Sequence, residues 1–241
     1  MNSTWIIAKR ELGSFFDSLV AYVLVVLFLG FSGFFTWLST NNVFYFNQAS
    51  LTVFFRISYW TLFIFIPAIT MKLIAEEKKT GTIELLFTKP ISDWNIIMGK
   101  FIAALLLIVV ALVLSLPYYF TVWSLGPVDH GAVLLGYLGL IFMSGVYISI
   151  GLFASSITNN QIVAFLLALL IGVFFHILFG VFANGLTGSA GMVFDYLDMN
   201  SHMESISRGV LDPADVIYFL SVIFLGLAGT EAVLAKRNIS E

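Results

Sequence analysis

The sequence predicts an all-α integral membrane protein in which residues 1–241 form a single transmembrane domain of six helices. Hydrophobic residues make up 60% of the chain and charged residues 10%, whereas a soluble domain usually carries about 25% charged residues. One globular core cannot enclose so large an apolar excess, which must therefore face lipid. The apolar residues also form continuous runs without the alternation of β-strands, and a helix satisfies its backbone groups within each run.

Six apolar runs approach the roughly 20 residues that a helix needs to cross the hydrocarbon core of a bilayer. The predicted spans are residues 19–38, 57–75, 99–123, 132–155, 161–183 and 216–235. The first run is too long for the apolar region of a cleavable signal peptide, so we expect it to remain as a span. The polar turn at 155–161 is short, and the fourth and fifth spans should therefore form an antiparallel hairpin.

The positive charges predict the orientation of these spans. With a cytosolic amino terminus, nine of the 11 lysines and arginines fall on the cytosolic side, as the positive-inside rule requires. These nine are Lys9, Arg10, Lys72, Lys78, Lys79, Lys89, Lys100, Lys236 and Arg237, whereas Arg56 and Arg208 fall outside. The acids expected outside are Asp129, Asp195, Asp198, Glu204, Asp212 and Asp215. Both termini are then cytosolic.

Residues 3–18 are expected to form an amphipathic N-terminal helix that lies in the membrane interface. A helical wheel places on one side Trp5, Ala8, Leu12, Phe15 and Phe16, and on the other Lys9, Arg10, Gly13, Ser14 and Asp17. Ile6 and Ile7 interrupt this pattern. The alternative is a helical extension of the first span that only sets its orientation.

The loop between the second and third spans, residues 76–98, has the composition of a docking element. Thr82 is placed to cap a short helix that Pro90 would end, and Ser92 is placed to cap the third span. The short helix carries more apolar surface than it buries by itself. Such a helix, rimmed by charge, is typical of a protein-binding segment. The alternative is a simple connection that lies on the lipid headgroups.

The outer segment, residues 184–214, is long for a simple connection. We expect helical pieces along the outer interface, and a plain extracellular loop is the alternative.

His176 is the histidine that falls inside a predicted span, and a hydrogen bond to a neighbouring helix is its commoner explanation. No carboxylate is expected near the middle of the membrane, so the energy for uphill transport would come from a partner subunit.

The motifs of several enzyme classes are absent from the sequence. It contains no zinc-protease motif, nucleophile elbow, P-loop or dinucleotide-binding pattern, and no cysteine. We therefore expect a chain that is not an enzyme and that binds no metal or cofactor. The net charge of −3, without a basic stripe, also argues against a nucleic-acid partner.

The cytosolic loop resembles a known family. Its residues read Glu76-Glu77-Lys78-Lys79-Thr80-Gly81-Thr82-Ile83-Glu84-Leu85-Leu86, then Lys89-Pro90-Ile91-Ser92, and are similar to the signature of ABC-2-type permeases. The resemblance implies a six-span, type V exporter-like bundle of the bacterial inner membrane, with cytosolic termini. It also implies an interfacial N-terminal helix and a re-entrant or helical element between spans five and six.

In that family the loop forms a coupling helix that sits in a groove of the ATPase. The residues implied for this contact are Glu76, Glu77, Gly81, Thr82, Glu84, Leu85, Leu86 and Pro90. The resemblance further implies cytosolic ABC ATPase subunits, which would hold ATP and Mg²⁺, and a second, different permease chain. Residues 158–165, 205–212 and 215–219 are similar to the permeases of gliding-motility ABC complexes.

The expected function is therefore that of an exporter permease, which couples ATP hydrolysis by a partner to transport or force transmission. The alternative is a membrane anchor or assembly subunit that transports nothing. Such a subunit would hold an ATPase that remodels or extracts membrane components, and it would need the same coupling segment.

Overall fold

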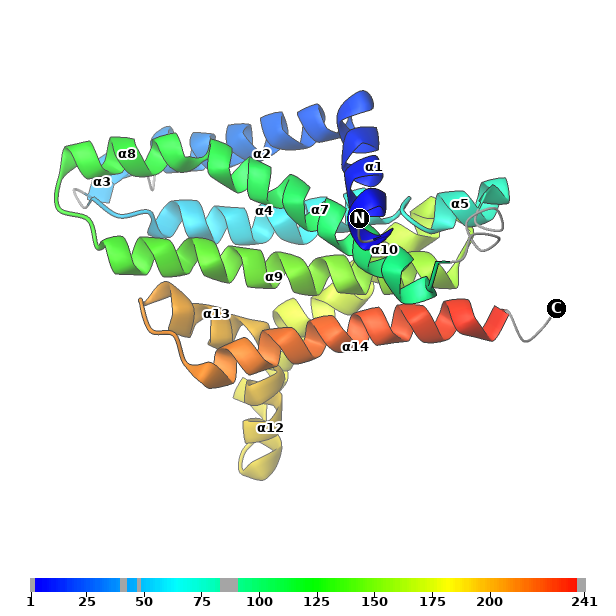
Figure 1. Cartoon of the computed structure of the whole chain (residues 1–241). Coiled ribbons are helices and arrows are strands. Elements are labelled where there is room, and N and C mark those ends of the chain that lie inside the picture. Colours follow the sequence, from blue (N-terminus) through cyan, green and yellow to red (C-terminus); the bar gives the residue numbers. More distant parts are fainter. Residues whose placement is uncertain (1–2, 40–42, 47–48, 83–90, 238–241) are drawn as a thin grey trace.

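The computed structural model describes residues 3–39, 43–46, 49–82 and 91–237, and every regular element in this part of the chain is helical (Figure 1). Six helices in the described ranges are long and apolar enough to cross a membrane, which confirms the predicted fold class. The elements are α1 (Ser3–Asp17), α2 (Val20–Trp37), α3 (Val43–Phe46), α4 (Thr52–Thr70), α5 (Ala75–Thr80), α7 (Asp93–Leu114), α8 (Leu116–Leu125), α9 (His130–Ile157), α10 (Gln161–Val173), η1 (Phe174–Leu178), α11 (Phe179–Gly185), α12 (Ser189–Leu197), α13 (Met199–Ser207) and α14 (Pro213–Arg237).

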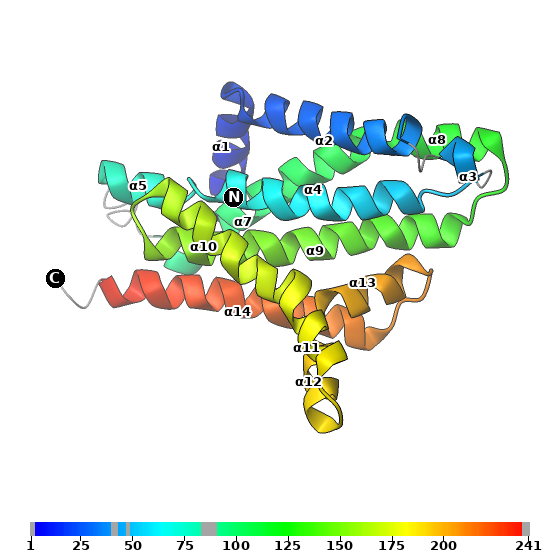
Figure 2. The same ribbon diagram turned by 180° about the vertical axis from the view of Figure 1, so that it is seen from behind.

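The long helices lie side by side, and α9 is at the centre of the bundle (Figures 1 and 2). It packs against α4, α7, α10, α13 and α14, and two thirds of its most apolar stretch is buried. The end of the bundle with α1 and α5 is called the α1 end, and the opposite end is called the α3 end. Helix α14, the last described element, finishes at the α1 end, as an even number of spans requires.

Helix α1 runs across the α1 end, at a steep angle to the long helices, and packs on α7 (Figure 1). Its buried residues are Ile7, Ala8 and Phe15. The predicted apolar face was therefore partly wrong: Trp5 is 50% exposed, whereas Ile7, which interrupted the predicted pattern, is 5% exposed. The reason lies in α7, where Gly99 has no side chain and leaves the space that Ile7 fills.

Three of the predicted spans depart from a single continuous α-helix. The third divides into α7 and α8 near Pro117, which stands in the first turn of α8 because it has no N–H to donate. The second continues past Pro67 and then turns from α4 into α5. The fifth contains the π-helical turn η1. The predicted cap of the third span is confirmed, because the Ser92 side chain accepts a hydrogen bond from Asn95 N–H.

The segment between spans five and six is helical. Helices α11 and α12 pack against each other and project sideways from the bundle, and α13 returns to pack against α9 and α14 (Figure 2). Helix α13 buries one face, on which Met199 and Ile206 are fully buried, whereas Asn200 and Glu204 on the other face are exposed. Asp198 and Asp215, which were expected on the outer side of the membrane, are buried in the protein, with exposures of 5% and 6%. Local hydrogen bonds, described below, hold both carboxylates inside the protein.

Candidate functional site

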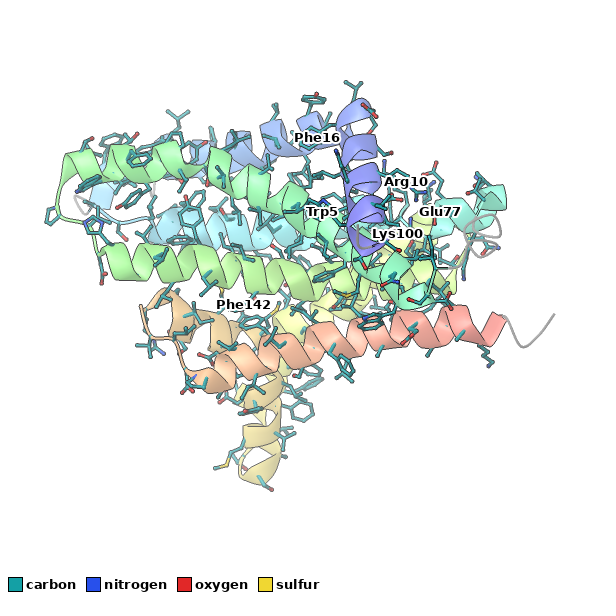
Figure 3. All side chains as sticks on the ribbon, viewed as in Figure 1. Trp5, Arg10, Phe16, Glu77, Lys100 and Phe142 are labelled. Carbon is teal, nitrogen blue, oxygen red and sulfur yellow. The ribbon has the colours of Figure 1, made fainter. Side chains whose placement is uncertain are left out.

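A buried lysine connects three helices at the α1 end. Lys100, in the second turn of α7, is 1% exposed. Its Nζ lies 2.7 Å from Oε1 of Glu77 in α5 and 3.3 Å from Oε1 of Glu11 in α1. A buried ammonium group is costly unless acceptors surround it, and here the two neighbouring helices each supply a carboxylate. Figure 3 shows Lys100, Glu77 and Arg10 where α1, α5 and α7 meet.

Arg10 adds a second positive charge to this group. Its Nη2 lies 2.5 Å from Oε1 of Glu11 and 3.8 Å from Oε1 of Glu77. Arg10, Glu11, Glu77 and Lys100 are called the charge cluster. Burial raises the pKa of Glu11, but Lys100 and Arg10 together outweigh it and hold that pKa below its ordinary value. Glu11 is therefore an acceptor at neutral pH.

The start of α5 is held from the other side by α9. The Ser155 hydroxyl accepts hydrogen bonds from the backbone N–H groups of Ile74, at 3.1 Å, and Ala75, at 2.9 Å. It donates to the Met71 carbonyl at 3.0 Å. One side chain therefore satisfies three backbone groups that the turn between α4 and α5 leaves without helical partners. The Lys78 ammonium group also donates to the Ser156 carbonyl.

The last residues of α5, Lys79 and Thr80, are exposed. Gly81 ends the helix in the left-handed conformation, with φ of 71°, which favours glycine because it has no Cβ. The hydroxyls of Thr80 and Thr82 lie 2.9 Å apart across this turn. Beside the turn, a surface cavity of about 560 Å³ is lined by α1, the α4–α5 connection and α5, including Arg10, Glu77 and Thr82.

The predicted contact residues divide into three groups. Glu76, Gly81 and Thr82 are exposed, so they are accessible to a partner. Glu77 instead turns inward to Lys100. The third group, Glu84, Leu85, Leu86 and Pro90, lies outside the described residues.

Four residues of this site were not predicted from the sequence. They are Arg10 and Glu11, which contact the Glu77–Lys100 pair, the buried Lys100, and Ser155, which caps the start of α5. Lys100 was assigned to the cytosolic charges, although it lies inside the predicted third span. A cation within an apolar run is itself a signal for a buried partner. The pairing of Ser155 with the α4–α5 turn joins positions about 80 residues apart and has no local signal.

The comparison with known families concerns most of the chain. The family model described as "ABC-2 family transporter protein" matches residues 5–207. The chain belongs to the ABC-2 transporter family. The matched residues of this ABC-2 chain include the whole charge cluster and Ser155. The family and the six apolar helices identify it as a multi-pass membrane protein. No curated protein sequence matches the chain.

Proposed function

We propose that this chain is the permease subunit of an ATP-driven exporter and that residues 76–98 dock onto a cytosolic ABC ATPase. The observation that carries the proposal is the contact between Lys100 and Glu77, because it fixes α5 to α7 at 2.7 Å. A segment that receives force from a partner must be joined to the helices that move. The charge cluster provides such a connection, and membership of the ABC-2 family supports the role.

Three connections would carry movement of α5 into the membrane part of the protein. Lys100 leads to α7, Arg10 and Glu11 lead to α1, and Ser155 leads to α9. The connection to α9 extends this path to the fourth span, beyond the second and third spans that flank residues 76–98. Because α9 packs on α4, α7, α10 and α14, movement at its end would reach most of the bundle. Docking at Thr82 would thus act on several spans at once.

The orientation in this proposal follows from charge. The described lysine and arginine side chains at the α1 end are Lys9, Arg10, Lys72, Lys78, Lys79, Lys100 and Lys236. Arg56 lies near the start of α4 and Arg208 follows α13, which places both toward the α3 end. The positive-inside rule then assigns the α1 end and both termini to the cytosol. The membrane would be the inner membrane of a bacterium.

Six spans would make half of a twelve-helix transport unit, so the proposal includes a second permease, a different chain rather than a second copy. ATP and Mg²⁺ would bind in the ATPase subunits, and this chain would hold no cofactor. The similarity of residues 158–165 and of the region 205–219 to gliding-motility permeases suggests an export system of that type.

The test is affinity purification of the tagged chain from native membranes in a mild detergent, with identification of bound chains and an ATPase assay. We expect an ATP-hydrolysing chain to co-purify with the native protein and to be lost with Leu86→Arg, and Glu84→Ala should weaken its binding. The matched control is Leu211→Arg, at an exposed position at the α3 end, which should retain the ATPase. Retention by both Leu86→Arg and Glu84→Ala, or the absence of any ATPase from the native preparation, contradicts the proposal.

A second measurement separates a permease from a membrane anchor. The co-purified complex is reconstituted into vesicles, and movement of material across or out of the membrane is followed with ATP. Transport that stops with Leu86→Arg supports the permease. Steady hydrolysis with extraction of membrane components, and no transport, favours the anchor or assembly subunit.

A further inference from the structure

A buried histidine joins α12 and α13, which lie between spans five and six, to α14, which is the sixth span. His202, in α13, is 7% exposed. Its Nδ1 lies 2.6 Å from Oδ1 of Asp215, in the first turn of α14. Its Nε2 lies 3.0 Å from the carbonyl oxygen of Tyr196, near the end of α12. The imidazole also stacks on the ring of Tyr218, with centroids 4.0 Å apart.

These two contacts determine how many protons the group holds. Both Asp215 Oδ1 and the Tyr196 carbonyl are acceptors, so each contact needs a hydrogen atom between the heavy atoms. A neutral imidazole beside a carboxylate supplies only one, and the other contact would place two lone pairs against each other. The observed geometry therefore requires one additional proton. Imidazole is a stronger base than a carboxylate, so this proton belongs on His202, which becomes an imidazolium ion.

The charged surroundings favour such an ion. From α14, Asp215 faces His202 directly, and its second oxygen, Oδ2, is buried without another partner among the described residues. At the start of α13, Oδ2 of Asp198 accepts hydrogen bonds from both the N–H and the hydroxyl of Ser201. The other described titratable groups on α13 and the elements packed against it are Asp195 and Tyr196 on α12, Glu204 on α13, Tyr218, Glu231 and Lys236 on α14, His130, Tyr137 and Tyr147 on α9, and His176 on η1. Tyr147 and His176 are hydrogen-bonded to each other, and α9 carries no Asp, Glu, Lys or Arg.

We propose that His202 and Asp215 form a proton-binding latch that holds α13 and the end of α12 against α14. With the proton bound, His202 donates to both neighbours and ties three consecutive elements together. When the proton leaves, one of the two contacts loses its hydrogen atom and becomes repulsive. Helix α13 then loses a connection on one side, to Tyr196 or to Asp215. The ligand of this site is the proton itself, and the site is independent of the ATPase contact proposed above.

The protonation of His202 is directly measurable, because the chain contains three histidines. The protein is labelled with ¹⁵N-histidine, and its imidazole signals are recorded in micelles from pH 5 to 10. The spectrum of His202→Gln assigns the His202 signals by their absence, and Asp215→Asn removes the carboxylate while it preserves shape. We expect both nitrogens of His202 to carry protons in the native protein at pH 7, because each faces an acceptor. Asp215→Asn should leave one of the two nitrogens without a proton.

The latch function is tested by the accessibility of α13. Because the chain has no cysteine, Ile206→Cys introduces one thiol at a buried position of α13. Its rate of maleimide labelling is measured across pH and divided by the rate of the same reporter in the His202→Gln background, which cancels the ionisation of the thiol. We expect this ratio to lie at least about tenfold below one at low pH and to rise toward one as His202 loses its proton. Gly30→Cys on α2, where no neighbour lies near, is the control reporter and should show a constant ratio.

Two results would overturn the inference. One is a His202 imidazole that is neutral at pH 7 in the folded protein. The other is a labelling ratio for Ile206→Cys that does not change while His202 titrates. If the His202→Gln variant does not fold, Asp215→Asn serves as the reference background for the same ratio.

Discussion

The Nζ atom of Lys100 lies 2.7 Å from Oε1 of Glu77, and this contact joins the buried second turn of α7 to the segment that follows the second span. Glu11 of α1 completes the arrangement from a third helix. Since the lysine side chain is 1% exposed and both carboxylates are partly accessible, the cation is the member that most depends on its partners. The relative placement of α1, α5 and α7 therefore depends on one ammonium group.

Replacing Lys100 by methionine should destabilise the protein. Methionine preserves the apolar stem but leaves Glu11 and Glu77 facing each other without the buried cation, and breaking a buried pair costs about 3 kcal/mol. The measurement is thermal unfolding in detergent, followed by intrinsic tryptophan fluorescence. Lys9→Met, the same change at an exposed position of α1, should leave the melting temperature nearly unchanged. Equal melting temperatures for Lys100→Met and Lys9→Met would show that the cluster contributes no stability.

The contribution of Glu11 should disappear in acid. Its folded pKa lies below its ordinary value of 4.5, so the stabilisation is complete above about that pH and is lost as the pH falls through the lowered pKa. The difference in melting temperature between the native chain and Glu11→Gln should therefore be constant near pH 7 and shrink below pH 4.5. If this difference in melting temperature instead grew below pH 4.5, folding would raise the pKa of Glu11, and the prediction would be contradicted.

Ser155 and Ser156 provide a matched pair of buried hydroxyls. Ser155→Ala leaves two N–H groups, those of Ile74 and Ala75, without their acceptor, and buried unpaired groups cost roughly 1–3 kcal/mol each. Ser156→Ala removes only a bond to the Phe153 carbonyl within its own helix. Hydrogen exchange of residues 71–80 should accelerate at least about tenfold in Ser155→Ala and remain near the native rate in Ser156→Ala. Similar rates in both variants would count against the connection from α5 to α9.

A side chain at Gly99 should push α1 away from α7. A Cβ at this position would lie 2.6 Å from Cγ2 of Ile7 and 3.1 Å from the Thr4 carbonyl oxygen, and overpacking of this kind costs about 1–3 kcal/mol. We expect Gly99→Ala to expose Ala8, which is buried in α1. Maleimide labelling of Ala8→Cys reports this exposure.

Two further variants check the cause of that exposure. Gly30→Ala on α2, where the added carbon meets nothing within 4 Å, should leave the labelling rate unchanged. Ile7→Gly combined with Gly99→Ala should restore slow labelling, because it removes both atoms of Ile7 that clash with the added carbon, Cγ2 at 2.6 Å and Cβ at 2.7 Å. If Gly99→Ala alone labels as slowly as the native background, the packing of α1 on α7 is looser than the geometry indicates.

The sequence was sufficient to predict the six spans because each depends on a local property, a continuous apolar run. Ser92 was also predictable as a cap, since a cap and the helix it begins are adjacent in sequence. The buried face of α1 was not, because Ile7 is buried by a gap at Gly99, which lies 92 positions later in the chain. Amphipathic patterns identify a helix but not the surface that it meets.

The buried acids illustrate the same limit at the other end of the bundle. Counting charges by predicted loop assigns Asp198 and Asp215 to the outer side of the membrane but gives no information about their burial. In the structure α13 folds back into the bundle, and Ser201 and His202 supply the donors that keep these carboxylates buried. A segment between two spans is polar enough to resemble a surface loop even when its polar groups are satisfied inside the protein.

A crosslink from Thr82 tests whether residues 76–98 dock onto an ATPase. Thr82→Cys places a single thiol at an exposed position next to Gly81 in the proposed docking segment, and Val210→Cys places one at the α3 end, also exposed. Each variant is labelled with benzophenone maleimide in native membranes, irradiated and analysed for attached chains. We expect an adduct between Thr82→Cys and an ATP-binding chain, and no such adduct from Val210→Cys. An ATP-binding chain attached equally from both positions, or from neither, would contradict the proposed docking.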